Sequence, residues 1–156
     1  MNGLANLLIF FLVPLTKQQE TYIRDSSALI NKLETIRHPT DCLIASFDIR
    51  QMYTNLEINE MVEAVGRAWD QLNSADYNIK VLNKNTIEIL TRFILENNYF
   101  TFNNKYYRQV IGASMGSKCS PGVADIKAYE VIKGIVNSFE TKEKLYSSDA
   151  TDIIVL

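Results

Sequence analysis

The chain has 156 residues, 47% of them hydrophobic and 22% charged, which fits one globular domain or part of a larger one. A folded chain of this size buries about two thirds of its unfolded surface, so a disordered protein is not the expected class. The formal net charge of -2 argues against a free-standing nucleic-acid-binding domain. It does not exclude one, because net charge does not say where the charges lie.

Cysteine and histidine are too few and too scattered for a zinc site. The two cysteines, Cys42 and Cys119, are far apart in the sequence, and His38 is the only histidine. We expect Cys42 to be a small buried apolar side chain. His38 precedes Pro39, and we expect it to lie in a loop without a special role.

The first predicted element is a helix in the apolar segment 4–15, LANLLIFFLVPL, ending near Pro14. A signal peptide would carry Lys or Arg before the apolar run, and a membrane span needs about 20 apolar residues. This segment meets neither condition. We therefore expect a buried helix, no membrane contact, and an intracellular location in the nucleus or the cytoplasm. A secretory or membrane segment is the alternative.

A second helix and a strand are predicted next. Asp25 or Ser26 can cap a helix whose apolar residues lie on one side. These residues are Leu29, Leu33 and Ile36. The segment 42–48, CLIASFD, is short and apolar, so it predicts a buried strand that ends at Asp48.

Two further helices follow the predicted strand. The first has apolar residues at helical spacing, namely Met61, Val65, Ala68 and Leu72. Asn85 and Glu88 then resemble a capping box at the start of the second. Its apolar face consists of Ile87, Leu90 and Ile94.

The remaining segments predict a hairpin, a loop, a helix and a weak strand. Residues 98–110 alternate around Asn103 and Asn104, which is typical of a hairpin. Pro121 suits the first turn of a helix lined by small and apolar residues. These are Ala124, Ala128, Val131, Ile135 and Phe139. With a final strand at 153–156, the order predicts an α+β fold, a small antiparallel sheet packed with helices.

Asp48 is the first candidate functional residue. A carboxylate at the end of a buried strand lies at an edge where side chains reach a cleft, and a divalent cation offsets the cost of burying its charge. The alternative is that Asp48 only caps the following turn.

The second candidate is the loop QVIGASMGSKCSP, residues 109–121. Gly112 and Gly116 are four residues apart and allow the backbone to come close to a ligand. The alternative is a connection before a helix, since the Gly-Lys-Ser register of a phosphate-binding loop is not present.

Together, the two segments resemble the reverse transcriptases of Penelope-like retroelements. In that family a strand ends in Asp and a Leu-Tyr-Thr-Asn-Ile-Pro-like string follows; here Asp48 is followed by the residues 52–56, MYTNL. The family's second motif is matched by Gln109, Gly112, Met115, Gly116, Ser117, Ser120 and Pro121. Upstream matches are Pro14, Leu15, Tyr22, Ile23 and Asp25. The resemblance covers residues from about 10 to 139.

The resemblance implies an RNA-directed DNA polymerase with an RNA template, a DNA primer and deoxynucleoside triphosphates as partners. Asp48 and the Ile49 carbonyl would hold Mg²⁺ or Mn²⁺ for two-metal nucleotidyl transfer. Tyr53 would pack under the incoming sugar. The nucleotide-binding loop would include Gln109, Gly112, Met115 and Gly116. Lys118 and Cys119 depart from the small or apolar residues of the family.

The third family motif, an aromatic residue followed by any residue and Asp-Asp, is degenerate in this chain. Its best alignment is with residues 149–152, which places Thr151 where the first Asp belongs and leaves Asp152 as a weak catalytic candidate. We expect one incomplete palm-and-fingers domain over 1–156, degenerate from 140, without thumb or basic fingers. We also expect an unpaired sheet edge next to residues 43–47, a marginal fold and no polymerase activity. The alternative is a non-catalytic RNA or RNA–DNA binding remnant.

Overall fold

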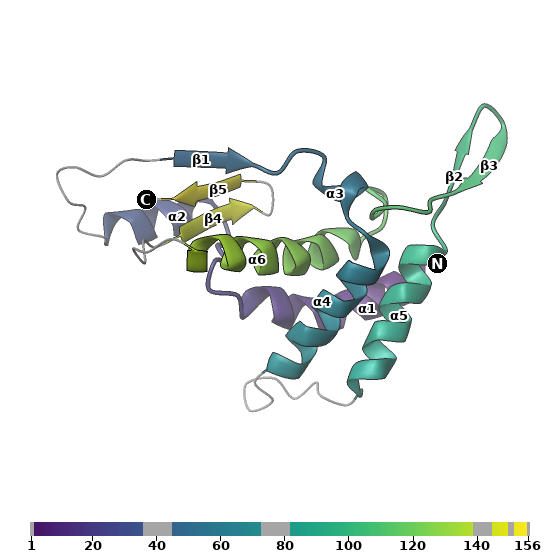
Figure 1. Cartoon of the computed structure of the whole chain (residues 1–156), viewed down its shortest axis with the longest axis horizontal. Helices are drawn as coiled ribbons and strands as arrows, with labels where there is room; N and C mark the ends of the chain where they lie inside the picture. The colour runs from purple at the N-terminus through teal and green to yellow at the C-terminus, as the bar shows by residue number, and fades with distance from the viewer. Residues whose placement is uncertain (1, 36–44, 73–81, 139–144, 150–151, 156) are drawn as a thin grey trace. The chain divides into compact units, whose positions relative to one another are not determined.

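The computed structural model describes residues 2–35, 45–72, 82–138, 145–149 and 152–155 (Figure 1). Within these ranges the chain forms six helices, a three-stranded antiparallel sheet and a two-stranded one. The predicted α+β class is confirmed. The predictions for His38 and Cys42 fall outside the described residues.

The chain divides into two compact units. The first consists of Met1–Gln18 and Gln51–Lys127, and the second of Gln19–Arg50 and Ala128–Leu156. The long helix α6, Ser120–Ser138, begins in the first unit and ends in the second.

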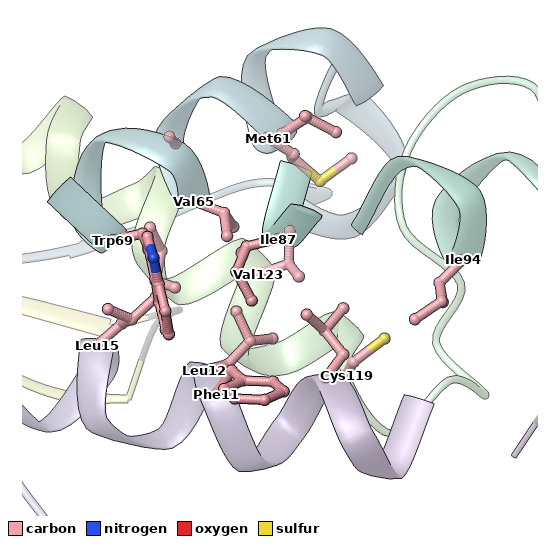
Figure 2. Packing of buried hydrophobic residues seen from close by; sticks show 14 of the residues in the cluster. Phe11, Leu12, Leu15, Met61, Val65, Trp69, Ile87, Ile94, Cys119 and Val123 are labelled. Atoms are coloured by element: carbon pink, nitrogen blue, oxygen red, sulfur yellow. The ribbon is translucent and has the colours of Figure 1, made fainter. Parts of the chain in front are cut away.

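The core of the first unit is built by helices α1 (Asn2–Lys17), α4 (Ile58–Gln71) and α5 (Lys84–Glu96). Helices α4 and α5 pack along each other, and α1 contacts both. Their buried side chains meet with those of the start of α6 in one cluster (Figure 2). The labelled members are Phe11, Leu12, Leu15, Met61, Val65, Trp69, Ile87, Ile94, Cys119 and Val123.

Helix α1 does not end near Pro14, as the sequence predicts, but continues to Lys17. Pro14 removes one backbone donor in the last turn, yet Leu12 and Leu15 on either side of it are buried and keep this turn packed. The opposite face of α1 is exposed at Leu4, Leu7, Phe10 and Val13. None of the helices in the described ranges is long and apolar enough to span a membrane.

Helix α5 begins two residues earlier than the predicted capping box. The side-chain oxygen of Asn83 accepts a hydrogen bond of 2.8 Å from the backbone N–H of Thr86, which makes Asn83 the N-cap. Asn85 therefore lies inside the helix. The side chain of Glu88 instead lies over Gly66 of α4, where any side chain at that position would collide with it.

The predicted hairpin is confirmed. Strands β2 (Tyr99–Phe102) and β3 (Lys105–Arg108) pair antiparallel. Asn103 and Asn104 connect them with φ angles of 49° and 58°, the left-handed pair that a two-residue hairpin turn requires. All eight strand residues are exposed, which the alternation of the sequence did not indicate.

The second unit contains helix α2 (Ser26–Glu34) and a sheet of the order β1-β5-β4. The strands are β1 (Ala45–Asp48), β4 (Leu145–Asp149) and β5 (Asp152–Val155). The strands whose absence was expected to leave an edge next to 43–47 unpaired are present, because β5 pairs with β1 and β4 with β5. In the order β1-β5-β4, β1 is nevertheless the outermost strand of the described sheet, so its other edge has no neighbouring strand there. Asp25 caps α2, as predicted, by accepting a 2.8 Å hydrogen bond from the Ala28 N–H.

The buried face of α6 differs from the predicted one beyond its first turns. Ala124 and Ala128 are buried, as expected, but Val131 and Ile135 are about half exposed. Ile132 takes their place in the core, and Phe139 lies outside the described residues.

Candidate metal centre and glycine loop

Three aspartates share one end of the three-stranded sheet. Asp48 is the last residue of β1 and lies opposite Asp152, the first residue of β5. Asp152 in turn lies opposite Asp149, the last residue of β4. Residues directly opposite on antiparallel strands have Cα atoms about 4.5–5.5 Å apart. The backbone register therefore brings Asp48 and Asp152, the two predicted catalytic acids, to neighbouring positions.

Asp48 is exposed, and Ile49 beside it is half-buried. The alternative role of Asp48 as the cap of the next turn has no support among the described residues, where no hydrogen bond involves its carboxylate. The short helix α3, Met52–Asn55, has Gln51 as its N-cap instead, at a left-handed φ of 53° and without a side-chain hydrogen bond. Among the described residues, the Asp48 carboxylate thus has no hydrogen-bond partner in the turn that follows it.

Hard divalent cations such as Mg²⁺ take carboxylate oxygen ligands, and two or more nearby like charges favour such a cation. The aspartates at this end of the sheet fit that donor chemistry. Among the side chains that the structure describes, no group of three or more His, Cys, Asp or Glu residues is placed to hold a metal ion. The three aspartates are thus brought together by the backbone register of β1, β5 and β4.

The glycine loop packs against α3. The Gly112 N–H donates to the carbonyl oxygen of Leu56 at 3.0 Å, and the Ala113 N–H donates to that of Tyr53 at 2.7 Å. Gly112 has a φ of 78°, and a Cβ at this position would collide with the Tyr53 carbonyl oxygen. The close backbone approach expected at Gly112 is thus made to the chain's own α3.

Gly116 does not have the same constraint. It is exposed, and a Cβ there would meet only the Ser114 Oγ, at 3.8 Å. Met115, before it, is 77% exposed. These two residues are free to face a ligand, as the predicted nucleotide-binding role requires.

Gln109, at the start of the glycine loop, and Tyr53, in α3, both have structural contacts. The Gln109 backbone N–H donates to the Asn98 carbonyl at 2.9 Å, and its Nε2 donates to the Ile111 carbonyl at 2.9 Å. The Gln109 side chain therefore stabilises the conformation of the loop by its hydrogen bond to Ile111. Tyr53 is half-buried and packs against the core cluster of the first unit.

Cys119 belongs to the core. It is fully buried in the hydrophobic cluster (Figure 2). Its Sγ lies 3.2 Å from the Ser117 Oγ. Burial raises the pKa of the Cys119 thiol above its ordinary value. A thiol with a raised pKa is a poor nucleophile and metal ligand. Its departure from the family pattern is thus a packing feature, whereas Lys118 next to it is exposed.

The predicted site residues fall into the two units. The second holds Asp48, Ile49 and Asp152, and the first holds the others. These are Tyr53, Gln109, Gly112, Met115 and Gly116.

Sequence reasoning missed a polar pocket of about 390 Å³ beside Gln109. It is lined by Glu57, Ile58, Asn59, Glu96, Arg108, Gln109 and Val110. No sequence signal could have found it, because its walls come from three separate elements. Comparison of the chain with protein-family models and with curated proteins gives no match.

Proposed function

We propose that this chain carries the palm region of a reverse transcriptase domain of the kind found in Penelope-like retroelements. The observation that carries the proposal is the register of Asp48 with Asp152. Two-metal nucleotidyl transfer needs carboxylates from separate chain segments at one place. These two aspartates are far apart in the sequence and occupy opposed positions on neighbouring strands.

In this proposal Asp48 and the Ile49 carbonyl hold Mg²⁺ or Mn²⁺, with Asp152 as a weaker participant. The metal ions would activate the primer's 3′-hydroxyl and neutralise the leaving pyrophosphate. Tyr53 would support the incoming sugar. Met115 and Gly116, the exposed part of the glycine loop, would lie along the nucleotide and template.

We further propose that this chain does not extend a primer. Thr151, which lies outside the described residues, stands where the family has the first Asp of its third motif. A neutral hydroxyl cannot supply the negative charge of a second metal site. Polymerase activity of the purified chain in Mg²⁺ or Mn²⁺ would contradict this part of the proposal.

Restoring the missing charge tests the assignment directly. The chain and its Thr151→Asp variant are titrated with Mn²⁺, and the free ion is followed by electron paramagnetic resonance. The variant should bind Mn²⁺ more tightly than the natural chain, and Asp48→Asn in the variant should reverse the gain. Asp70→Asn is the matched control, since Asp70 forms only an exposed ion pair with Lys84. Equal Mn²⁺ affinity in all four proteins would refute the metal centre.

A second candidate is a non-catalytic module that binds RNA or an RNA–DNA hybrid. It is favoured by Lys105 and Arg108, which are exposed and form no ion pair with any described residue. Phosphate contacts by such cations weaken as salt rises. Absence of RNA binding at low salt would exclude this candidate.

A further inference from the structure

The hairpin β2–β3 exposes aromatic rings on both of its faces. Phe100 and Tyr107 lie opposite each other and stack, with ring centroids 5.5 Å apart and an interplanar angle of 20°. Because strand side chains alternate, Phe102 and Lys105 share their face. The other face carries Tyr99, Thr101, Tyr106 and Arg108.

These rings are not part of a core. Phe102 is 70% and Tyr106 84% exposed. In Figure 1 the hairpin projects away from helix α5, which precedes it in the same unit. An isolated two-stranded hairpin has little intrinsic stability, and leaving large rings in water forgoes the stabilisation that burial would supply. Packing within the described structure therefore does not account for this concentration of aromatic residues.

The charged side chains of the hairpin and of the loop after it in the sequence are all cations. No acidic residue occurs between Glu96 and Asp125, whereas this stretch contains Lys105, Arg108 and Lys118. All three cations are exposed. In a chain of net charge -2, the hairpin and the loop after it thus carry cations beside exposed rings, which suits a polyanion. Arg108 also lines the pocket that contains Glu57 and Glu96.

We infer that the hairpin β2–β3 binds single-stranded nucleic acid, with bases stacked on its exposed rings and phosphates paired with Lys105 and Arg108. Exposed aromatic side chains alternating with cations are the combination that single-stranded nucleic acids bind, because every base has a stacking face. The inference deepens the binding function proposed above, and rests on it for the class of ligand. It requires neither Asp48 nor a metal ion.

The exposed rings favour a single strand over a duplex, because stacking on a ring needs a base whose face is open. Phe100 and Phe102 are two residues apart on one face, which corresponds to roughly 7 Å along the strand. Nucleotides of a duplex strand advance by about 3.4 Å and their base faces are covered by neighbours. A duplex therefore offers no free base faces to the rings, whereas an unstacked single strand does.

The test measures binding of fluorescently labelled oligouridylate, oligothymidylate and a duplex of mixed sequence to the full chain by anisotropy, in EDTA. The single strands should bind and the duplex should bind more weakly. Phe102→Ala and Tyr106→Ala should each weaken single-strand binding about five-fold or more. Changing both Lys105 and Arg108 to Gln should weaken it and reduce its dependence on salt.

Matched controls are Phe93→Ala on α5, another half-exposed ring, and Lys17→Gln, another exposed cation. Neither should change binding. The emission of Trp69, the only tryptophan, reports that each variant is folded. Binding that resists both ring variants, or that favours the duplex, overturns the inference. Concentration-dependent self-association abolished by the ring variants, without nucleic-acid binding, would assign the surface to a second copy instead.

The two proposals fail separately. Loss of single-strand binding in the ring variants, in EDTA, supports the hairpin whether or not Thr151→Asp gains Mn²⁺ affinity. A gain of Mn²⁺ affinity without any binding of single strands supports the metal centre and refutes nucleic-acid binding by the hairpin.

Discussion

The Ala113 N–H donates a 2.7 Å hydrogen bond to the carbonyl oxygen of Tyr53, although the two residues are far apart in the sequence. The neighbouring bond from Gly112 to Leu56 lies beside it. Carbonyl groups at the end of a helix have no intrahelical partner, and the loop supplies partners for these two. Backbone hydrogen bonds therefore connect Tyr53 and Leu56, in the first segment of the family resemblance, to the glycine loop, which is the second.

Gly112→Ala should be strongly destabilising. The variant would need a left-handed φ in a residue with a Cβ, and that Cβ would collide with the Tyr53 carbonyl. We expect a loss of about 2–3 kcal/mol in the free energy of unfolding, measured by urea denaturation. Gly134→Ala is the control, since nothing lies within 4 Å of a Cβ there. It should be neutral or stabilising by about 0.5–1 kcal/mol, because Gly134 lies within α6. Equal effects would contradict the described packing.

Asn83→Ala should shorten or weaken α5, because it removes the side-chain acceptor for the Thr86 N–H. Loss of an N-cap costs about 1 kcal/mol. Asn85→Ala, the matched control inside the helix, should be neutral or slightly stabilising, since Ala is the better helix former. Chemical denaturation of the two variants compares them. A larger loss for Asn85→Ala would support the capping box predicted from the sequence.

The predicted N-cap of α5, Asn85 instead of Asn83, shows where local sequence patterns are not sufficient. Asn83 and Asn85 are both good caps, and the spacing to Glu88 favours the wrong one. The helix begins at Asn83, and the side chain of Glu88, the expected partner of Asn85, lies over Gly66 of another helix. Short-range signals succeeded where one residue type has one role, as with Asn103-Asn104 in the hairpin turn and Asp25 at the start of α2.

Strand β4 and the candidate site could not be predicted from local sequence patterns, because both depend on the pairing of strands. The segment 145–149, LYSSD, has neither strict alternation nor an apolar run, and it forms a strand through its pairing with β5. Asp48 could be predicted as the acid that ends a strand. Its register with Asp152 could not, because register depends on pairing between strands that are far apart in the sequence.

Asp25 should make stability depend on pH. A hydrogen bond from the Ala28 N–H, helped by one from Arg24, holds the pKa of the Asp25 carboxyl below its ordinary value. A carboxyl whose pKa is lower in the folded state stabilises the fold fully above the unfolded pKa, near 4. This contribution is lost as the pH falls through the folded pKa.

Asp25→Asn keeps a good N-cap but cannot titrate, so it is the matched comparison. Between pH 6 and acid pH, the natural chain should lose more stability than the variant. Carboxyl NMR signals of Asp25 would give the folded pKa directly. A folded pKa at or above the ordinary value would contradict the capping hydrogen bond.

Cys119 should resist alkylation in the folded chain. Its thiol is fully buried and its pKa is raised by burial, so both access and thiolate population are low. Peptide-resolved mass spectrometry after iodoacetamide treatment should find it unmodified without urea and modified in urea. Rapid modification of the Cys119 peptide without urea would place the thiol outside the core.

Trp69 of α4 contacts both α1 and the segment before α5, and should be the most sensitive core position. Its ring meets Phe11 of α1 edge to face at 5.8 Å, and its Nε1 donates to the Leu82 carbonyl at 3.2 Å. Trp69→Phe retains a ring but leaves that carbonyl without its donor, at a cost of about 1–3 kcal/mol. Trp69→Ala also opens a cavity and should cost about 3–5 kcal/mol. Unfolding followed by circular dichroism separates the two. If Trp69→Phe were as stable as the natural chain, the hydrogen bond to Leu82 would contribute nothing, and ring packing alone would explain the burial of this residue.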